Sequence, residues 1–270
     1  MVQNIIYACV IVTALGAVFG AGLSIAAKHF AVKKDEKLEA LEAALPGYNC
    51  GSCGMSGCSG YAEALFNGSI TEVTKCGPGG AKAAARIAEI LGLAVDLSAE
   101  KMVAHCHCRG DNENAVKAME YKGIQDCNVA FAMFQGYKAC KYGCLGFGSC
   151  IKVCPAGAIT KTGTGLVQVD KDKCISCGAC TKVCPTHAMR MIPYSATHVV
   201  DCNSHDKGPA VKKACKVGCI GCKMCEKKSP EGGFVVDNFL ASIDYSKTGE
   251  RDTACASCPA KCIVDLRASK

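Results

Sequence analysis

The sequence has no tryptophan, and aromatic residues make up only 6% of it, without any run of Lys and Arg interleaved with stacking side chains. Binding of nucleic acid is therefore not expected, because single strands are held on aromatic platforms within basic grooves. Neither a G-x-G-x-x-G fingerprint nor a phosphate loop occurs, so this chain is not expected to bind NAD or flavin. No catalytic acid, base or nucleophile is indicated. The formal net charge of +7 instead suits an acidic partner or an anionic membrane surface.

The first 27 residues have no charged side chain. Residues 5–27 are mostly apolar and would span about 34 Å as a helix at 1.5 Å per residue, enough for a hydrocarbon core of about 30 Å. A cleaved signal peptide is the alternative, but the start is not basic, the apolar run is too long, and KHFAVKK follows it in place of a cleavage site. Residues 1–27 therefore predict a single transmembrane anchor.

Three basic residues, Lys28, Lys33 and Lys34, follow this segment directly. Because basic flanks stay on the cytoplasmic side, we expect a single-pass protein of the cytoplasmic membrane whose remaining chain faces the cytoplasm. Residues 28–46 are expected to form a charged stalk helix that stops at Pro46.

Cysteine, in contrast, accounts for 24 of the 270 residues. Such a density suggests disulfides in a short secreted chain, but the C-x2-C-x2-C spacing found here is that of iron–sulfur ligands, which need a reducing compartment. In residues 174–185, CISCGACTKVCP, three thiolates on one loop grip a [4Fe–4S] cube, and the fourth normally serves a second cluster. A zinc ribbon would use two C-x2-C pairs and has no use for the third cysteine or for the Cys-Pro step.

A partner motif precedes this run at residues 140–155, and residues 158–173 between them predict a β-hairpin. Residues 140–195 therefore resemble a bacterial-type two-cluster ferredoxin domain. Crossed ligation predicts one cube held by Cys154, Cys174, Cys177 and Cys180. The other cube would take Cys144, Cys150 and Cys184, with Cys140 in the place of the ligand that Phe147 has replaced.

A smaller cysteine motif lies in residues 47–95. Cys50, Cys53 and Cys58 are spaced C-x2-C-x4-C, and Cys76 follows in KCGPGG, so four thiolates complete one cube. Glycines in this loop let backbone N–H groups approach the sulfurs. Residues 81–93 then predict an amphipathic helix that covers the cluster, with Ile87, Ile90 and Leu91 inward.

The first ferredoxin motif recurs 75 residues later, so that residues 196–270 form a second, degenerate repeat. This repeat is predicted to hold one cube, through Cys219, Cys222, Cys225 and Cys258. Its sister site has lost its ligands, because the equivalent positions are Ser229, Thr248, Arg251 and Ala254. Residues 233–246 are expected to close over that space as a hairpin.

Residues 96–139 are expected to connect the two cluster-binding parts. They contain HCHC at residues 105–108, whose His105 and His107 are expected to be solvated loop residues rather than ligands. Several cysteines could supply a further cube or remain buried free thiols, and the two alternatives are equally favoured: Cys106, Cys108, Cys127, Cys202, Cys215, Cys255 and Cys262. Cys9, within the apolar run, is interpreted as a small apolar filler.

The charge-free start, the basic stalk, the Cys50–Cys76 motif and the ferredoxin repeats together resemble the B subunit of the Rnf complex, over essentially the whole chain. That complex is a membrane-bound ferredoxin:NAD oxidoreductase that translocates Na+ or H+. The resemblance implies an electron-transfer subunit that accepts electrons from reduced ferredoxin and passes them to membrane-embedded subunits. A polyferredoxin-like subunit of a hydrogenase or formate-oxidising membrane complex is the alternative, but the residue 50–80 motif is not part of ordinary ferredoxin repeats.

The fold class expected is therefore α+β. We expect a transmembrane helix, a small [4Fe–4S] domain and tandem ferredoxin-like domains, with at least four [4Fe–4S] clusters and a fifth favoured.

Overall fold

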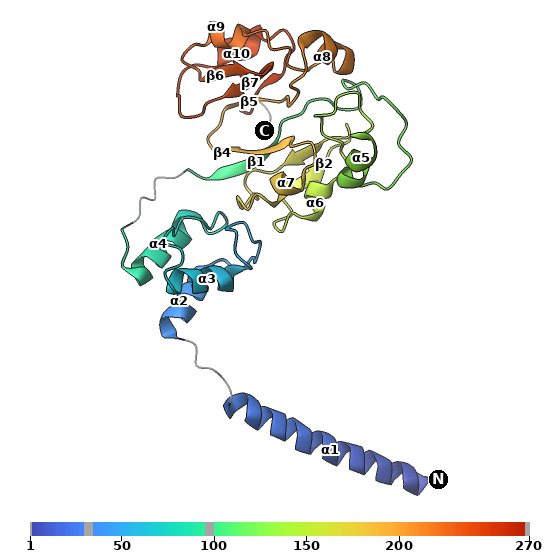
Figure 1. Ribbon diagram of the computed structural model, residues 1–270, viewed down its shortest axis with the longest axis vertical. Coiled ribbons are helices and arrows are strands. Elements are labelled where there is room, and N and C mark those ends of the chain that lie inside the picture. The colour runs from blue at the N-terminus through green and yellow to red at the C-terminus, as the bar shows by residue number, and fades with distance from the viewer. Residues whose placement is uncertain (1, 30–34, 95–99, 268–270) are drawn as a thin grey trace. The chain divides into compact units, whose positions relative to one another are not determined.

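The computed structural model describes residues 2–29, 35–94 and 100–267 (Figure 1). Lys33 and Lys34 of the predicted basic flank lie outside the described residues. The chain divides into two compact units, Met1–Ala40 and Leu41–Lys270.

The first unit consists mainly of helix α1, Val2–His29. Its described side chains are largely apolar and exposed, among them Ile11, Val18 and Leu23. Within the described part of the chain, no helix meets the length and apolarity that crossing a membrane requires. Helix α2, Glu36–Ala44, begins in this unit and ends in the next, with its first turn carrying Glu36 and Glu39.

The second unit opens with a small helical domain. Its helices are α3, Cys58–Phe66, and α4, Gly80–Leu91. Buried Tyr61 of α3 donates its hydroxyl to the carbonyl oxygen of Glu72 at 2.7 Å and so fixes the connecting loop. The predicted helix at residues 81–93 is present, but of its three inward residues only Ile87 is fully buried; Ile90 and Leu91 are half-buried, because small alanines fill the inward face.

The first ferredoxin-like repeat has two antiparallel strand pairs (Figure 1). Strand β1, Met102–Cys106, pairs with β4, Met189–Pro193, and β2, Ile159–Lys161, pairs with β3, Val167–Val169. Its helices are α5, Cys127–Phe134, α6, Ser149–Lys152, and α7, Ala179–Val183. The predicted hairpin at residues 158–173 is confirmed. Strand β1 comes from the segment expected to be a connection, yet it completes the sheet with β4.

The second repeat has the same order of elements. Strand β5, His198–Val200, pairs with β8, Ile263–Asp265, and the hairpin is β6, Phe234–Asp237, with β7, Leu240–Ile243. Its helices are α8, Gly208–Ala214, α9, Met224–Lys228, and α10, Asp252–Ser257. The hairpin predicted at residues 233–246 is confirmed, and the mixture of short helices and strands confirms an α+β fold.

Cysteine makes up much of the buried core of each repeat. The first core includes Cys144, Cys150 and Cys180 beside residues such as Ile159, and the second includes Cys219 and Cys225. A core this rich in thiols and poor in large apolar side chains is typical of domains whose metal centres contribute folding energy.

Candidate functional site

The cysteines of the second unit gather into five groups of four, here called sites A to E. Site A contains the four residues predicted for the small domain, Cys50, Cys53, Cys58 and Cys76, around one cavity. Asn49 holds the start of α3 by accepting the backbone N–H of Cys58 on its Oδ1 at 2.8 Å. Burial raises the pKa of Cys76, and the other three cysteines raise it further, while the backbone N–H of Gly79 lowers it.

Site B also contains the predicted residues, Cys154, Cys174, Cys177 and Cys180. Two sulfurs accept backbone N–H groups: Cys174 from Ala104 at 3.5 Å and Cys154 from Ala158 at 3.3 Å. Burial, followed by the three neighbouring sulfurs, raises the pKa of Cys180 to about 12. Four crowded sulfurs cannot all be thiolates without a cationic partner, whereas the N–H donors favour thiolates. This donor set fits an iron–sulfur cluster.

Site C differs from the prediction. Its cavity is lined by Cys127, Cys144, Cys150 and Cys184, so the structure places Cys127, not Cys140, beside the other three. The cause lies at the start of α5, where Asp126 caps the helix and Ser149 accepts the backbone N–H of Cys127 at 2.9 Å.

Phe147, which stands where a ligand would be in the first motif, does not line the cavity of site C. Its ring lies 5.3 Å from the ring of Tyr121 and 5.4 Å from that of Tyr137, measured between centroids. The first motif therefore supplies two sulfurs to site C, Cys144 and Cys150, and α5 supplies another.

Site D lies between the two repeats and is assembled from four cysteines that the sequence left unplaced or assigned elsewhere: Cys108, Cys140, Cys202 and Cys215. Cys140 and Cys215 are equivalent by the 75-residue repeat, and Cys108 and Cys202 each stand two residues after a strand, β1 or β5.

Glycines lie close to the sulfurs of site D. A Cβ on Gly143 would lie 3.8 Å from the sulfurs of both Cys108 and Cys140, and one on Gly110 would lie 3.5 Å from that of Cys215. Burial raises the pKa of Cys202 to about 11, although the backbone N–H groups of Ser204 and Cys219 lower it in part. The pocket of sulfurs and close backbone fits the same group as site B.

Site E contains the predicted Cys219, Cys222, Cys225 and Cys258, but Cys262 lines the same cavity. The sulfurs of Cys258 and Cys262 are 3.6 Å apart. The thiol of Cys262 lowers the pKa of Cys258 to about 5 and that of Cys219 to about 6. Cys262 thus lies where its thiol can donate to the sulfurs of Cys258 and Cys219, and Cys258, before Pro259, matches Cys184 of the first repeat.

The lost sister site of the second repeat is filled by protein. Ala254 is fully buried in the core and Ser229 is 4% exposed. Arg251 turns its guanidinium to the carbonyl oxygens of Gly232 and Lys247.

Among the cysteines whose side chains the structure describes, Cys106, Cys255 and Cys262 stand outside the groups of four. Cys106 donates its thiol to Cys144 and lowers the pKa of Cys144 to about 6. The sulfur of Cys255 donates to the carbonyl oxygen of Ile263 at 3.3 Å. These cysteines are spare thiols with hydrogen-bond partners.

The two histidines of HCHC are not solvated loop residues, so that prediction is wrong. His105 lies in β1 with its Nε2 2.7 Å from an oxygen of Asp201, and His107 is 8% exposed with its Nδ1 2.9 Å from the carbonyl oxygen of Val200. Burial lowers the pKa of His107 to about 3. Both rings fasten the strand β1 and its following loop to β5.

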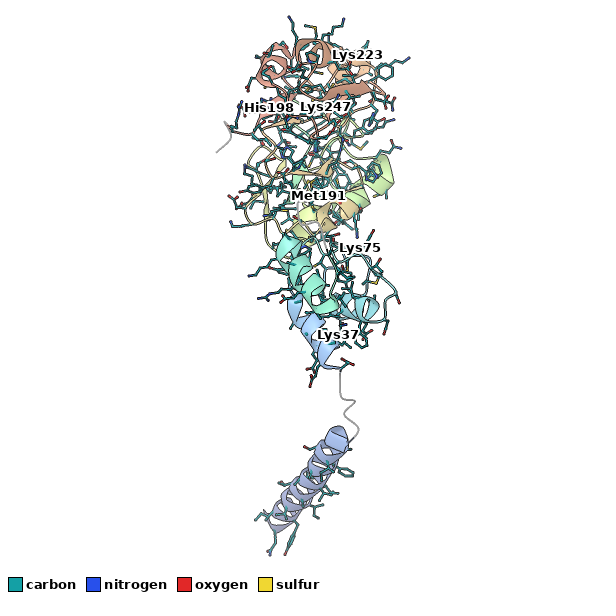
Figure 2. The ribbon with its side chains drawn as sticks, turned by 90° about the vertical axis from the view of Figure 1, so that its left-hand side faces the viewer. Lys37, Lys75, Met191, His198, Lys223 and Lys247 are labelled. Atoms are coloured by element: carbon teal, nitrogen blue, oxygen red, sulfur yellow. The ribbon has the colours of Figure 1, made fainter. Side chains whose placement is uncertain are left out.

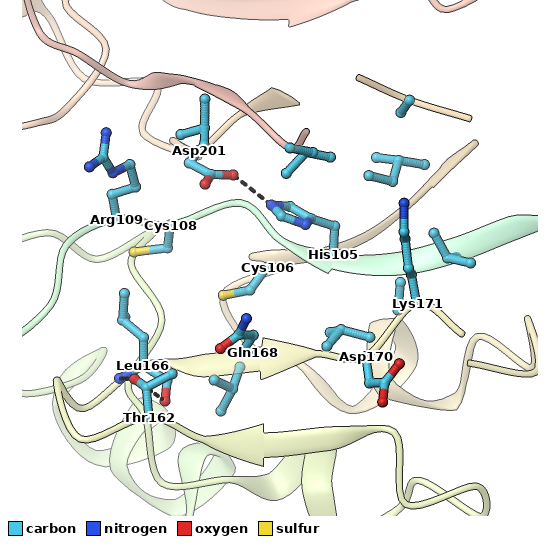
Figure 3. Close-up of a pocket in the computed structure, with 18 of the residues that line it drawn as sticks. His105, Cys106, Cys108, Arg109, Thr162, Leu166, Gln168, Asp170, Lys171 and Asp201 are labelled. Carbon is cyan, nitrogen blue, oxygen red and sulfur yellow. Dashed lines mark hydrogen bonds and ion pairs between the residues drawn. The ribbon is translucent and has the colours of Figure 1, made fainter. Parts of the chain in front are cut away.

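The His105–Asp201 contact borders a cavity of about 650 Å³ between β1, the β2–β3 hairpin and the second repeat (Figure 3). Cys106 and Cys108 lie on its wall. Because Cys106 contacts Cys144 of site C and Cys108 belongs to site D, the cavity gives water access to the neighbourhood of both sites. Solvent access is one of the factors that set cluster reduction potentials.

Two family models match parts of this chain. The one described as "Putative Fe-S cluster" matches residues 45–78, which contain site A, and the one described as "4Fe-4S binding domain" matches residues 167–190. With two ferredoxin-like repeats and five groups of four cysteines, these matches define an iron–sulfur electron-transfer protein.

Relatives extend this class to a family. The B subunit of the proton-translocating ferredoxin:NAD(+) oxidoreductase complex of Clostridium ljungdahlii is 41% identical, covering 97% of this chain and 90% of the relative. The B subunit of the ion-translocating oxidoreductase complex of Methanosarcina acetivorans is 39% identical over 99% and 100%. The B subunit of the Na(+)-translocating complex of Acetobacterium woodii is 40% identical over 97% and 78%. The chain belongs to the family of the Rnf B subunit, as its motifs predicted.

Proposed function

We propose that sites A to E each hold one [4Fe–4S] cluster and that the chain relays single electrons along them in the order E, D, C, B, A. A bound cluster supplies one-electron transfer at a potential set by its surroundings. The observation that carries the proposal is that each site is linked to the next through named sulfurs or their backbone.

Two links join the first three sites. Cys50 of site A acts electrostatically on Cys177 of site B, and a Cβ on Gly77 would lie 2.5 Å from the carbonyl oxygen of Ser176. Cys180 of site B likewise acts on Cys150 of site C.

The remaining two links are hydrogen bonds to sulfur. The backbone N–H of Cys144, in site C, donates to the sulfur of Cys108 in site D. The backbone N–H of Cys219, in site E, donates to the sulfur of Cys202 in site D at 3.2 Å. These contacts support a single path in which no site is bypassed.

Reduced ferredoxin is the proposed electron donor, and it would dock at site E. Cys222 is exposed, and Lys223 beside it lies at the surface (Figure 2). Further exposed lysines surround the second repeat: Lys212, Lys213, Lys216, Lys227 and Lys228. An acidic ferredoxin would be steered to this face by charge. The proposal thus includes an extended docking surface rather than a deep pocket.

We propose that electrons leave the chain from site A, the group nearest in the chain to the apolar residues 5–27, and pass to other membrane subunits. Those apolar residues form a single membrane anchor in this proposal, and the iron–sulfur part lies on the cytoplasmic side. The charge-free run and the membership of an ion-translocating family support this. In this proposal NAD and flavin bind to other subunits.

Iron and acid-labile sulfide counted in anaerobically purified protein test the relay. We expect about 20 of each per chain, four per cluster, and a brown colour that bleaches on reduction. A colourless, zinc-containing protein would refute the electron-transfer function. About 16 iron atoms would mean that one of the five sites lacks a cluster.

A further inference from the structure

Lys138 is a buried lysine between sites C and D. Its side chain is 5% exposed, and its Nζ donates to the carbonyl oxygens of Cys144 and Gly110, both at 2.7 Å. Cys144 belongs to site C, and Gly110 lies against the sulfurs of site D, whose cavity Lys138 also lines. One ammonium group therefore lies against both sites at once.

The two acceptors of Lys138 are neutral carbonyl groups. Asp111 is close enough for the ammonium to lower its pKa, but its Oδ1 already accepts the backbone N–H groups of Glu113 and Asn114. A buried charge is costly unless an opposite charge compensates it. The groups that can do so are the Asp111 carboxylate and the cysteine sulfurs: Lys138 also opposes the burial that raises the pKa of Cys108.

We propose that Lys138 raises the reduction potentials of the clusters at sites C and D, and so sets the electron affinity of the middle of the relay. The inference rests on the proposed clusters. A cube held by four thiolates is an anion, and reduction makes it more negative, so a nearby buried cation favours the reduced form. Burial limits screening by salt, which makes this cation more effective than any surface lysine.

The second repeat supplies a built-in comparison. Lys213 is the equivalent of Lys138 by the 75-residue repeat, KAC against KAC, but it is exposed. The backbones explain the difference: Lys138 is in an extended stretch paired with Lys117, whereas Lys213 is in the last turn of α8. Of these two equivalent lysines, Lys138 therefore lies between two sites and Lys213 lies in solvent.

The test is a potentiometric titration followed by EPR on the full chain, comparing Lys138→Gln with Lys213→Gln. Glutamine keeps a donor for the carbonyl groups and removes the charge. In Lys138→Gln we expect two clusters to become about tenfold harder to reduce, about 59 mV for one electron, with the other three unchanged. Lys138→Arg keeps the charge and should leave both potentials at the values of the unmodified protein. Lys213→Gln should shift none of the five potentials. Cys127→Ser and Cys202→Ser assign the two signals to sites C and D.

Unchanged potentials in Lys138→Gln with full iron content would overturn the inference. So would an equal shift in Lys213→Gln, because that would be a general effect of net charge. A structural role for Lys138 would instead lower the iron content and leave the remaining clusters at their original potentials. Failure of the proposed clusters themselves would appear earlier, as missing iron in the unmodified protein.

Discussion

The backbone N–H of Cys219 donates to the sulfur of Cys202 at 3.2 Å, joining a residue of site E to one of site D. Cys144 and Cys108 repeat this relationship between sites C and D. In both cases the acceptor follows the first strand of a repeat and the donor is the second cysteine of its motif. The two repeats thus use one backbone contact to bring neighbouring sites together.

Replacing Cys127 should distinguish the ligand set of site C from the set that motif spacing indicates. Cys127→Ser is expected to remove about four iron atoms and one EPR signal, because its sulfur shares the cavity with Cys144, Cys150 and Cys184. Cys106→Ser is the matched control: Cys106 forms a hydrogen bond with Cys144 but lies outside the group, so the iron content should remain complete. A full iron content in Cys127→Ser would mean that another cysteine is the fourth ligand of site C.

Site E allows a second pair of variants. Cys258→Ser should abolish the signal of one cluster, whereas Cys262→Ala should keep it at a more negative potential, because a thiol donor to Cys258 and Cys219 is lost. Ser229→Cys should add no cluster, since Arg251 and Ala254 occupy the sister site. If Cys262→Ala loses the cluster and Cys258→Ser does not, the two roles are reversed.

The sequence was sufficient where ligands share one loop. Three residues of each of sites A, B and E follow from short spacings. Cys76 follows from its KCGPGG segment, Cys154 and Cys258 follow from crossed ligation, and both hairpins follow from their turns and alternation. It was insufficient where the partner sulfur follows from neither motif spacing nor crossed ligation. Cys127 precedes the first motif and Cys140 begins it, and only the cap by Asp126 and the hydroxyl of Ser149 decide which one reaches Cys150.

Site D could not have been assembled from spacing, because Cys108 and Cys202 come together only through the placement of β1 and β5. The 75-residue repeat did pair Cys140 with Cys215, and that symmetry was the signal available. The histidines of HCHC were misjudged for the same reason: their partners, Asp201 and Val200, lie in the other repeat.

Two equivalent glycines should be sensitive to substitution. Gly146 and Gly221 have φ values of 72° and 65°, and a Cβ on either would meet the hairpin turn of its repeat, at the carbonyl oxygens of Gly165 and Phe239. Gly157, at φ 59° with nothing within 4 Å of a Cβ, is the control. Gly157→Ala should cost about 1–2 kcal/mol from the left-handed backbone alone.

Gly146→Ala and Gly221→Ala should destabilise the protein more than Gly157→Ala and lower the cluster content at sites C and E respectively. Thermal unfolding under anaerobic conditions, with iron analysis, measures both effects. Equal losses in all three variants would mean that the hairpin contacts contribute nothing.

Ferredoxin-dependent reduction should slow steeply as salt rises, because exposed charges are screened within about 10 Å at 0.1 M. Lys227→Glu with Lys228→Glu should slow it by roughly tenfold at low salt. Lys122→Glu is the control, since Lys122 is also exposed but lies in the first repeat. If the rate depends neither on salt nor on the Lys227→Glu and Lys228→Glu substitutions, these lysines serve solubility and not ferredoxin docking.

The proposed anchor predicts the side on which the clusters lie. A reporter fused after Lys270 should be active only in its cytoplasmic form, because the basic flank and reduced thiolates require the same side. Removal of residues 1–27 should release the chain from membranes washed with alkaline carbonate. Activity of a periplasmic reporter would refute the proposed sidedness.

Because site D takes Cys108 and Cys140 from one repeat and Cys202 and Cys215 from the other, its cluster would act as a staple between two halves of the chain. Metal binding contributes folding energy only to a site whose ligands are all present, so the first half cannot complete site D until the second has been synthesised. Loading of sites A, B and C can precede the synthesis of Cys215, whereas loading of site D must follow it. The order in which the clusters are inserted would then follow the order in which the chain is synthesised.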